Sequence, residues 1–183
     1  MGASDRRSRS VRTIVTISLL VAMELALTAL ESTFPPFIPF PGVKLGLANI
    51  VTLISFSLIK KRQVLLVVLL RLILTGLVLG TFLTPAFWIS SGGGLLSFFV
   101  MAIGSGCRLI SIVGVSLIGA AAHNIGQLIA LSLLLSNVGV IYYLPWLLLW
   151  SVPTGLFTGF SARLVISALR GAGYSPDLTR RKI

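Results

Sequence analysis

The stretch ESTFPPFIPFPGVKLGLAN, residues 31–49, decides how the chain folds. It lies between two apolar segments. It cannot continue a helix, because each proline ring removes a backbone donor and clashes with the preceding turn. We therefore expect this stretch to end one membrane helix and to connect it to the next. It contains four prolines, which are Pro35, Pro36, Pro39 and Pro41. Three aromatic residues lie among them, and these are Phe34, Phe37 and Phe40.

The composition places the chain in a membrane. Of its 183 residues, 56% are hydrophobic and only 10% are charged, whereas a typical soluble domain has about 25% charged residues. Only helices and closed barrels satisfy their own backbone polar groups in lipid. The apolar runs are long and do not alternate with polar residues, so they indicate helices.

The spacing of these runs predicts an all-α bundle of six transmembrane helices, within a membrane domain at residues 13–170 between two basic tails. The expected spans are about 13–29, 44–59, 64–83, 95–107, 109–135 and 144–169. Glycines 92–94 and the Asn-Val-Gly run at 137–139 are expected to form turns. Pro153 is expected to kink the last span.

The basic residues give the orientation. The net charge is +11, and the clusters lie before the first span, between the second and third, and at the C-terminus. The other three connections, 31–44, 84–94 and 136–143, contain no Lys or Arg except Lys44. This asymmetry follows the positive-inside rule and places both termini in the cytoplasm. It argues against nucleic-acid binding. The single Cys107 excludes an internal disulfide.

Two charged residues lie inside predicted spans. Glu24 is about 12 residues into the first span and Arg71 about nine residues into the third, roughly 18 Å and 13 Å from the inner side. Ionisable groups in a bilayer are costly and usually functional. We therefore expect an intramembrane ion pair between Glu24 and Arg71. The alternative is a structural pair that holds two helices and touches no ligand.

Further polar residues lie toward the outer end of the bundle. Glu31 is seven residues after Glu24 and falls on nearly the same helix face. Lys44 and Asn49 begin the next span. Together these residues predict a polar track from the outer surface into the bundle. The alternative for Glu31 and Lys44 is ordinary placement at the membrane interface.

A second polar cluster lies in the fifth span. His123 and Gln127 are one helical turn apart, and Asn124 flanks them. These three side chains predict either a binding site or interhelical hydrogen bonds of the kind common in membranes. A lone histidine without a nearby cysteine or carboxylate is weak support for a metal. We expect neither a metal nor another cofactor.

Small residues form a stripe on the first span. Ala22, Ala26 and Ala29 share one face, and such faces let another helix approach closely. The stripe predicts either packing within the bundle or docking to a separate membrane protein. Gly155 and Gly159 in the last span pose the same alternatives.

Three blocks carry a resemblance to a known family. PFPGVKLGLANIVTL (39–53), the Arg71 helix, and SLIGAAAHNIGQLIA (116–130) followed by YLPWLLLWSVPTGLFTG (143–159) resemble the Gx transporter family, also labelled heptaprenyl diphosphate synthase component I. That family is similar to the substrate-binding S components of energy-coupling factor (ECF) vitamin transporters. The resemblance implies a six-helix, S-component-like bundle with a ligand cavity that opens outward under the first long loop. It also implies docking through Ala22 and Ala26 to a transmembrane coupling subunit driven by two ATPases.

The synthase label finds little support in the residues. The usual prenyl diphosphate chemistry needs paired Asp-rich motifs that hold magnesium and diphosphate. The only aspartates are Asp5 and Asp177, both in the basic tails. The sequence also has no Walker A lysine motif for ATP hydrolysis. We therefore expect a protein that is not an enzyme.

The sequence thus predicts a multi-pass subunit of the cytoplasmic membrane that binds a small molecule for uptake, such as a vitamin or an isoprenoid or quinone precursor. The expected binding residues are Glu24, Glu31, Lys44, Asn49, Arg71, His123, Asn124 and Gln127. Phe34, Phe37 and Phe40 are expected to form a lid. The alternative is a non-catalytic subunit or scaffold of isoprenoid, quinone or extracytosolic electron-transfer machinery.

Overall fold

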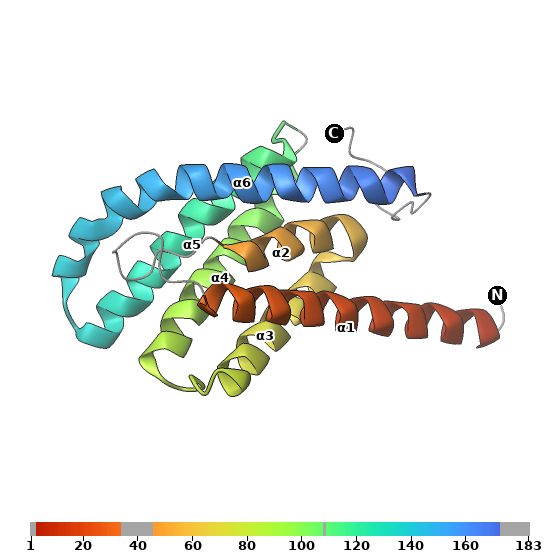
Figure 1. Cartoon of the computed structure of the whole chain (residues 1–183), viewed down its shortest axis with the longest axis horizontal. Coiled ribbons are helices and arrows are strands. Elements are labelled where there is room, and N and C mark those ends of the chain that lie inside the picture. Colours follow the sequence, from red (N-terminus) through yellow and green to blue (C-terminus); the bar gives the residue numbers. More distant parts are fainter. Residues whose placement is uncertain (1–2, 34–45, 108, 173–183) are drawn as a thin grey trace.

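The computed structural model describes residues 3–33, 46–107 and 109–172, and these parts of the chain form a helical bundle (Figure 1). The described residues contain six α-helices and one short 3₁₀ helix. The bounds are α1 Ala3–Thr33, α2 Leu47–Leu58, α3 Lys61–Val78, α4 Pro85–Gly104, α5 Ile112–Leu135, η1 Val138–Tyr143 and α6 Leu144–Gly171.

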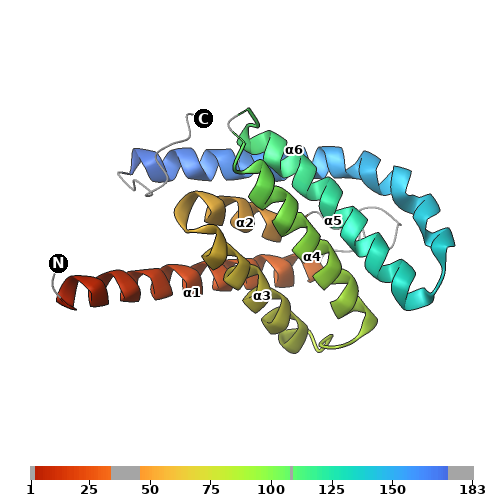
Figure 2. The same ribbon diagram turned by 180° about the vertical axis from the view of Figure 1, so that it is seen from behind.

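Helix α2 contacts each of the other five α-helices. Helix α2 lies between α1 and α6 and contacts both, as Figures 1 and 2 show from opposite sides. Helix α3 packs against α1 and α4. Helix α5 packs between α4 and α6. The start of α1 and the end of α6 lie toward the same end of the bundle (Figures 1 and 2).

Four of the described helices are long and apolar enough to cross a membrane. They cover Val11–Glu31, Pro85–Gly104, Ile112–Leu135 and, with η1, Val138–Gly171. Large apolar side chains such as Ile103 and Leu133 remain about three-quarters exposed, at 76% and 75%, as expected for a surface in lipid. The chain is therefore an all-α membrane protein, as the composition predicts.

The remaining two helices leave the predicted count of six spans open. Helix α2 has 12 residues, which is about 18 Å against the roughly 30 Å of a hydrocarbon core. Helix α3 has 18 residues, but Lys61, Arg62 and Arg71 lie within it. Six crossings and the cytoplasmic position of both termini stay predictions.

The expected turn at residues 92–94 is wrong. These glycines lie inside α4, which begins at Pro85 and continues to Gly104 without a break. Pro85 suits the first helical position, where its missing N–H has no partner to lose. A Cβ atom on Gly92 would lie 2.8 Å from the carbonyl oxygen of Gly126 on α5. Gly92 and Gly93 let α4 and α5 approach closely, whereas Gly94 leaves room for Arg71 and Leu72 of α3.

Other helix ends also differ from the predicted spans. Helix α1 begins at Ala3 and ends at Thr33, so it extends beyond 13–29 at both ends. Helix α3 begins at Lys61, where the Gln63 side chain accepts a hydrogen bond from the backbone N–H of Lys60. It ends at Val78, because Gly80 and Leu83 turn the chain with positive φ angles. Helix α6 continues through Pro153 and bends in its first half (Figure 1).

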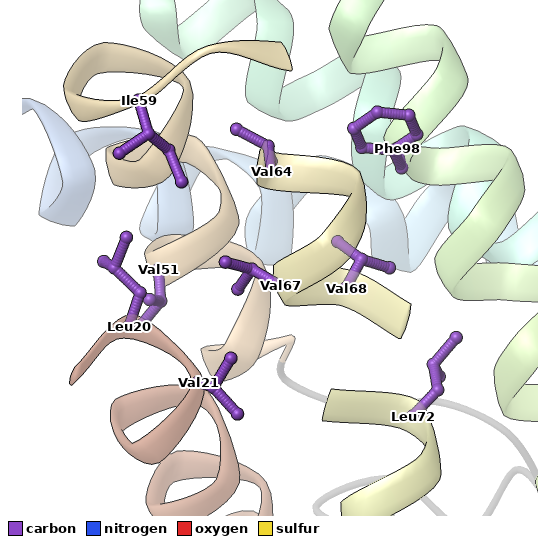
Figure 3. Packing of buried hydrophobic residues seen from close by; sticks show 9 residues of the cluster. All are labelled: Leu20, Val21, Val51, Ile59, Val64, Val67, Val68, Leu72 and Phe98. Carbon is purple, nitrogen blue, oxygen red and sulfur yellow. The ribbon is translucent and has the colours of Figure 1, made fainter. Parts of the chain in front are cut away.

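Two apolar clusters form the interior. Figure 3 shows the first, in which side chains from α1, α2, α3 and α4 meet. Its members are Leu20, Val21, Val51, Ile59, Val64, Val67, Val68, Leu72 and Phe98. The second joins α2, α4, α5 and α6 through Leu53, Ile54, Met101, Val115, Ala162 and Ile166. In the first cluster, apolar side chains of α1, α2 and α3 pack against one another.

Candidate functional site

A buried carboxylate joins three helices. Glu24 of α1 is fully buried, and its Oε2 lies 3.4 Å from Nε of Arg71 on α3. The hydroxyl of Thr52 on α2 donates a hydrogen bond to Glu24 Oε1 at 2.6 Å. The predicted ion pair between Glu24 and Arg71 is therefore confirmed. Thr52 supplies the third contact, which the sequence analysis did not identify.

A cavity of about 190 Å³ lies next to this ion pair. Its polar wall includes Thr28, Glu31, Asn49, Arg71, Thr75 and His123, which come from α1, α2, α3 and α5. Its apolar wall includes Leu72, Leu79 and Phe87. The cavity thus offers charged, hydrogen-bonding and apolar surface within one small volume.

Glu31 connects two walls of the cavity. Its Oε1 accepts a hydrogen bond from the backbone N–H of Gly46 at 2.8 Å, which ties the end of α1 to the start of α2. Gly46 has φ 74°, a left-handed conformation that glycine adopts without a steric penalty. A glycine at this position in the KLGLAN block therefore has a structural reason.

Four of the predicted binding residues line the cavity together. They are Glu31, Asn49, Arg71 and His123, and Glu24 lies behind Arg71 as its partner. Lys44 and the predicted lid residues fall outside the described residues, so those expectations stay predictions. The lid residues are Phe34, Phe37 and Phe40.

Asn124 and Gln127 are placed differently from His123. Asn124 is buried and donates a hydrogen bond from Nδ2 to the carbonyl oxygen of Leu147 at 2.8 Å, which ties α5 to α6. Asn124 also borders a hollow of about 10 Å³ that adjoins the cavity at Asn49 and His123. Gln127 lines neither space. Its side chain packs against α4 instead, because a Cβ atom added to Gly93 would lie only 2.6 Å from Gln127 Cγ. These contacts favour interhelical roles for Asn124 and Gln127.

The two stripes of small residues also differ. Ala22 and Ala26 are exposed on α1, and Ala29 is half-buried. Packing inside the bundle therefore does not account for the first two. Gly155 and Gly159 of α6, by contrast, face α5, where added Cβ atoms would come within 3.0 Å and 2.9 Å of backbone Cα atoms.

Hydroxyl residues of the cavity went unnoticed in the sequence. Thr28 follows Glu24 by four residues, and Thr75 follows Arg71 by four. Residues four apart share a helix face, so this spacing was a usable signal. Phe87 and Ser90 also line the cavity. They were missed because residues 84–94 were expected to form a connection outside the helices.

The comparisons with known proteins agree with the resemblance seen in the sequence. The family model described as heptaprenyl diphosphate synthase component I matches residues 20–165. That range contains the ion pair and all the described residues that line the cavity. Comparisons with curated proteins and with solved structures found no match. Because the matched range covers most of the chain, the protein belongs to the heptaprenyl diphosphate synthase component I family.

Proposed function

We propose that the protein is a binding subunit of the cytoplasmic membrane that captures a small molecule from the outer side for uptake. The cavity beside Arg71 carries this proposal. A charged side chain within a membrane bundle is costly and is retained where it serves a pathway or a site. Here that side chain lines a space of about 190 Å³ together with other polar groups.

The position of the cavity supports capture from outside. Glu31 lies near the end of α1, the opposite end from the basic N-terminal segment. The start of α1 and the end of α6 lie toward one end of the bundle, which supports an even number of crossings (Figures 1 and 2). With the basic clusters in the cytoplasm, Glu31 and the cavity mouth belong to the outer half.

Energy coupling is the second part of the proposal. Ala22 and Ala26 leave a flat exposed strip on α1, and Ser18 extends it by one turn. A strip of small residues at four-residue spacing lets a partner helix approach its backbone. We propose that an ECF-type transmembrane subunit, driven by ATPases, docks there.

Native mass spectrometry of the full chain, purified in a mild detergent, tests the binding function. We expect one small molecule per protein, retained through purification. Thr75→Val changes the cavity wall at nearly constant volume and should reduce the retained fraction. Ser167→Ala, on the exposed side of α6, is the control and should retain the ligand. A wild-type protein without ligand, in cells and media where uptake is active, would contradict the proposal.

A second candidate function comes from the family description. "Component I" of a synthase implies a second component, for which the exposed alanine strip would be a docking surface. The cavity volume of about 190 Å³ is below the roughly 300–1,000 Å³ of ordinary small-molecule sites, so it suits a ligand of only a few heavy atoms and not a polyprenyl chain. Co-purification of a soluble prenyl-transferring subunit, rather than an ATPase module, would favour this candidate.

A further inference from the structure

Arg71 has hydrogen-bonding capacity that the protein leaves unused. A guanidinium carries five N–H donors, and the ion pair with Glu24 lies on the Nε side, where Nε itself makes no hydrogen bond with the described residues. Within the described part of the chain, neither terminal nitrogen of Arg71 makes a hydrogen bond. Gly94 makes room for them, because a Cβ there would lie 2.9 Å from Arg71 Nη2. Arg71 therefore offers donors to the cavity that it lines.

Thr75 repeats this pattern one turn along α3. Its Oγ1 is buried and has no hydrogen-bond partner among the described residues. Buried polar atoms nearly always make a hydrogen bond, so a buried atom without one is an exception that needs a reason. Thr75 also lines the cavity. Arg71 and Thr75 together form a donor surface that suits a carboxylate or a similar acceptor group.

The charge balance argues against a simple anion. Glu24 already neutralises Arg71, and Glu31 adds a further carboxylate to the described lining. One Glu31 oxygen accepts from Gly46, and the other accepts no hydrogen bond from the described residues. Among the described residues, a ligand with only negative charge would leave that Glu31 oxygen without a donor and would be repelled by it. A ligand with only positive charge would leave the donors of Arg71 and Thr75 unused.

We infer that the cavity binds a small amphoteric molecule, with an acceptor group at Arg71 and Thr75 and a cationic group at Glu31. Glu24, the partner of Arg71, and Glu31 are seven residues apart, which is roughly 10 Å along α1. Leu72, Leu79 and Phe87 supply an apolar wall. The ligand class is thus a short zwitterion with an apolar middle, and this inference rests on the proposed binding function.

Three probes of equal length test this inference. They are 6-aminohexanoate, hexanoate and hexylamine, which present both charges, the negative charge alone and the positive charge alone. Dissociation constants are measured by displacement of the co-purified ligand in native mass spectra of the full chain, or by direct binding if none is present. We expect 6-aminohexanoate to bind at least tenfold more tightly than either of the other two.

Two variants assign the two ends of the ligand. Glu31→Gln should remove most of the tenfold preference for 6-aminohexanoate over hexanoate, without weakening hexanoate. Thr75→Val should weaken 6-aminohexanoate and hexanoate several-fold and leave hexylamine unchanged. Ser167→Ala is the control for both. Neither cavity variant breaks the Glu24–Arg71 pair, so both are expected to fold.

The outcomes separate this inference from the proposed function. Equal affinity for 6-aminohexanoate and hexanoate would overturn the amphoteric ligand, as would a co-purified ligand that carries charge of one sign. Either result leaves a binding protein in place. A chain that binds none of the probes also overturns the inference. The proposed function then depends on whether a co-purified ligand is present.

Discussion

The contact between α4 and α5 and the junction of α1, α2 and α3 hold helices together by opposite means. At the first, Gly92 and Gly126 bring two backbones into contact with no side chain between them. At the second, Glu24, Thr52 and Arg71 meet through charged and polar side chains. The glycine contact leaves no space, whereas the polar junction borders a cavity of about 190 Å³.

The difference shows how a membrane bundle can combine rigidity with a binding space. Lipid tails are as apolar as leucine, so burial of apolar side chains does not drive membrane helices together. Close backbone packing and polar contacts remain as the sources of association. In this chain, glycines lie where α4 and α5 pack closely, and charged side chains lie beside the cavity.

Breaking the ion pair should have the largest effect. Glu24→Gln or Arg71→Gln alone leaves one buried charge without a partner, and removal of one member of a buried pair costs about 3–5 kcal/mol. The double variant should be less destabilised than either single variant, because it leaves no unpaired charge. Thermal or detergent-induced unfolding of the purified variants measures these differences. Destabilisation that simply adds in the double variant would show that the two residues act independently.

Filling the glycine contact should have the next largest effect. An added methyl group at Gly126 would meet the backbone of Gly92 and Gly93, which cannot move aside as a flexible side chain can. Overpacking costs about 1–3 kcal/mol, so Gly126→Ala should lower the unfolding temperature and Gly126→Val more so. Gly171→Ala is the matched control, because no atom lies within 4 Å of its added Cβ. Equal stability of Gly126→Ala and Gly171→Ala would show that α4 and α5 are less tightly packed than described.

The same two regions show what the sequence could and could not predict. Glu24 and Arg71 could be paired from their depth in their spans alone, because a buried charge needs a partner and few were available. The glycines at 92–94 were misread because a glycine run indicates a turn in water, whereas between membrane helices it indicates close packing.

The cavity could not be predicted from the sequence and became visible only in the structure. Its described lining comes from five helices, α1 to α5, and from residues between them, and no spacing along the chain relates Arg71 to His123 or Phe87. The threonines at 28 and 75 did carry a signal, since each lies one turn after a buried charge. Ala22 and Ala26 could be grouped on one face from their spacing, but only the fold shows that this face is exposed.

A smaller effect is expected where α5 meets α6. Ser116 and Thr158 share a hydrogen bond of 2.6 Å between their hydroxyl groups, next to Gly159. Such bonds between membrane helices contribute on average about 0.6 kcal/mol. Thr158→Val should therefore lower the unfolding temperature much less than Glu24→Gln. Ser167→Ala removes a hydroxyl that bonds only within α6 and provides the baseline. A loss as large as that of the ion-pair variants would place this hydroxyl pair among the main contacts.

The smallest effect on stability is expected at the exposed strip of α1, and this is where stability and function should separate. Ala22→Leu with Ala26→Leu enlarges side chains that touch no other part of the bundle's core, so the free energy of unfolding should change by less than about 0.5 kcal/mol. Ala168→Leu, on the exposed side of α6, is the same substitution on another face.

If a coupling helix docks on α1, uptake of the co-purified ligand by cells should fall sharply in the Ala22/Ala26 variant and remain normal in the Ala168 variant. Ligand binding by the purified protein should be unchanged in both, because neither face borders the cavity. Normal uptake by the Ala22/Ala26 variant would show that no coupling helix docks on this strip.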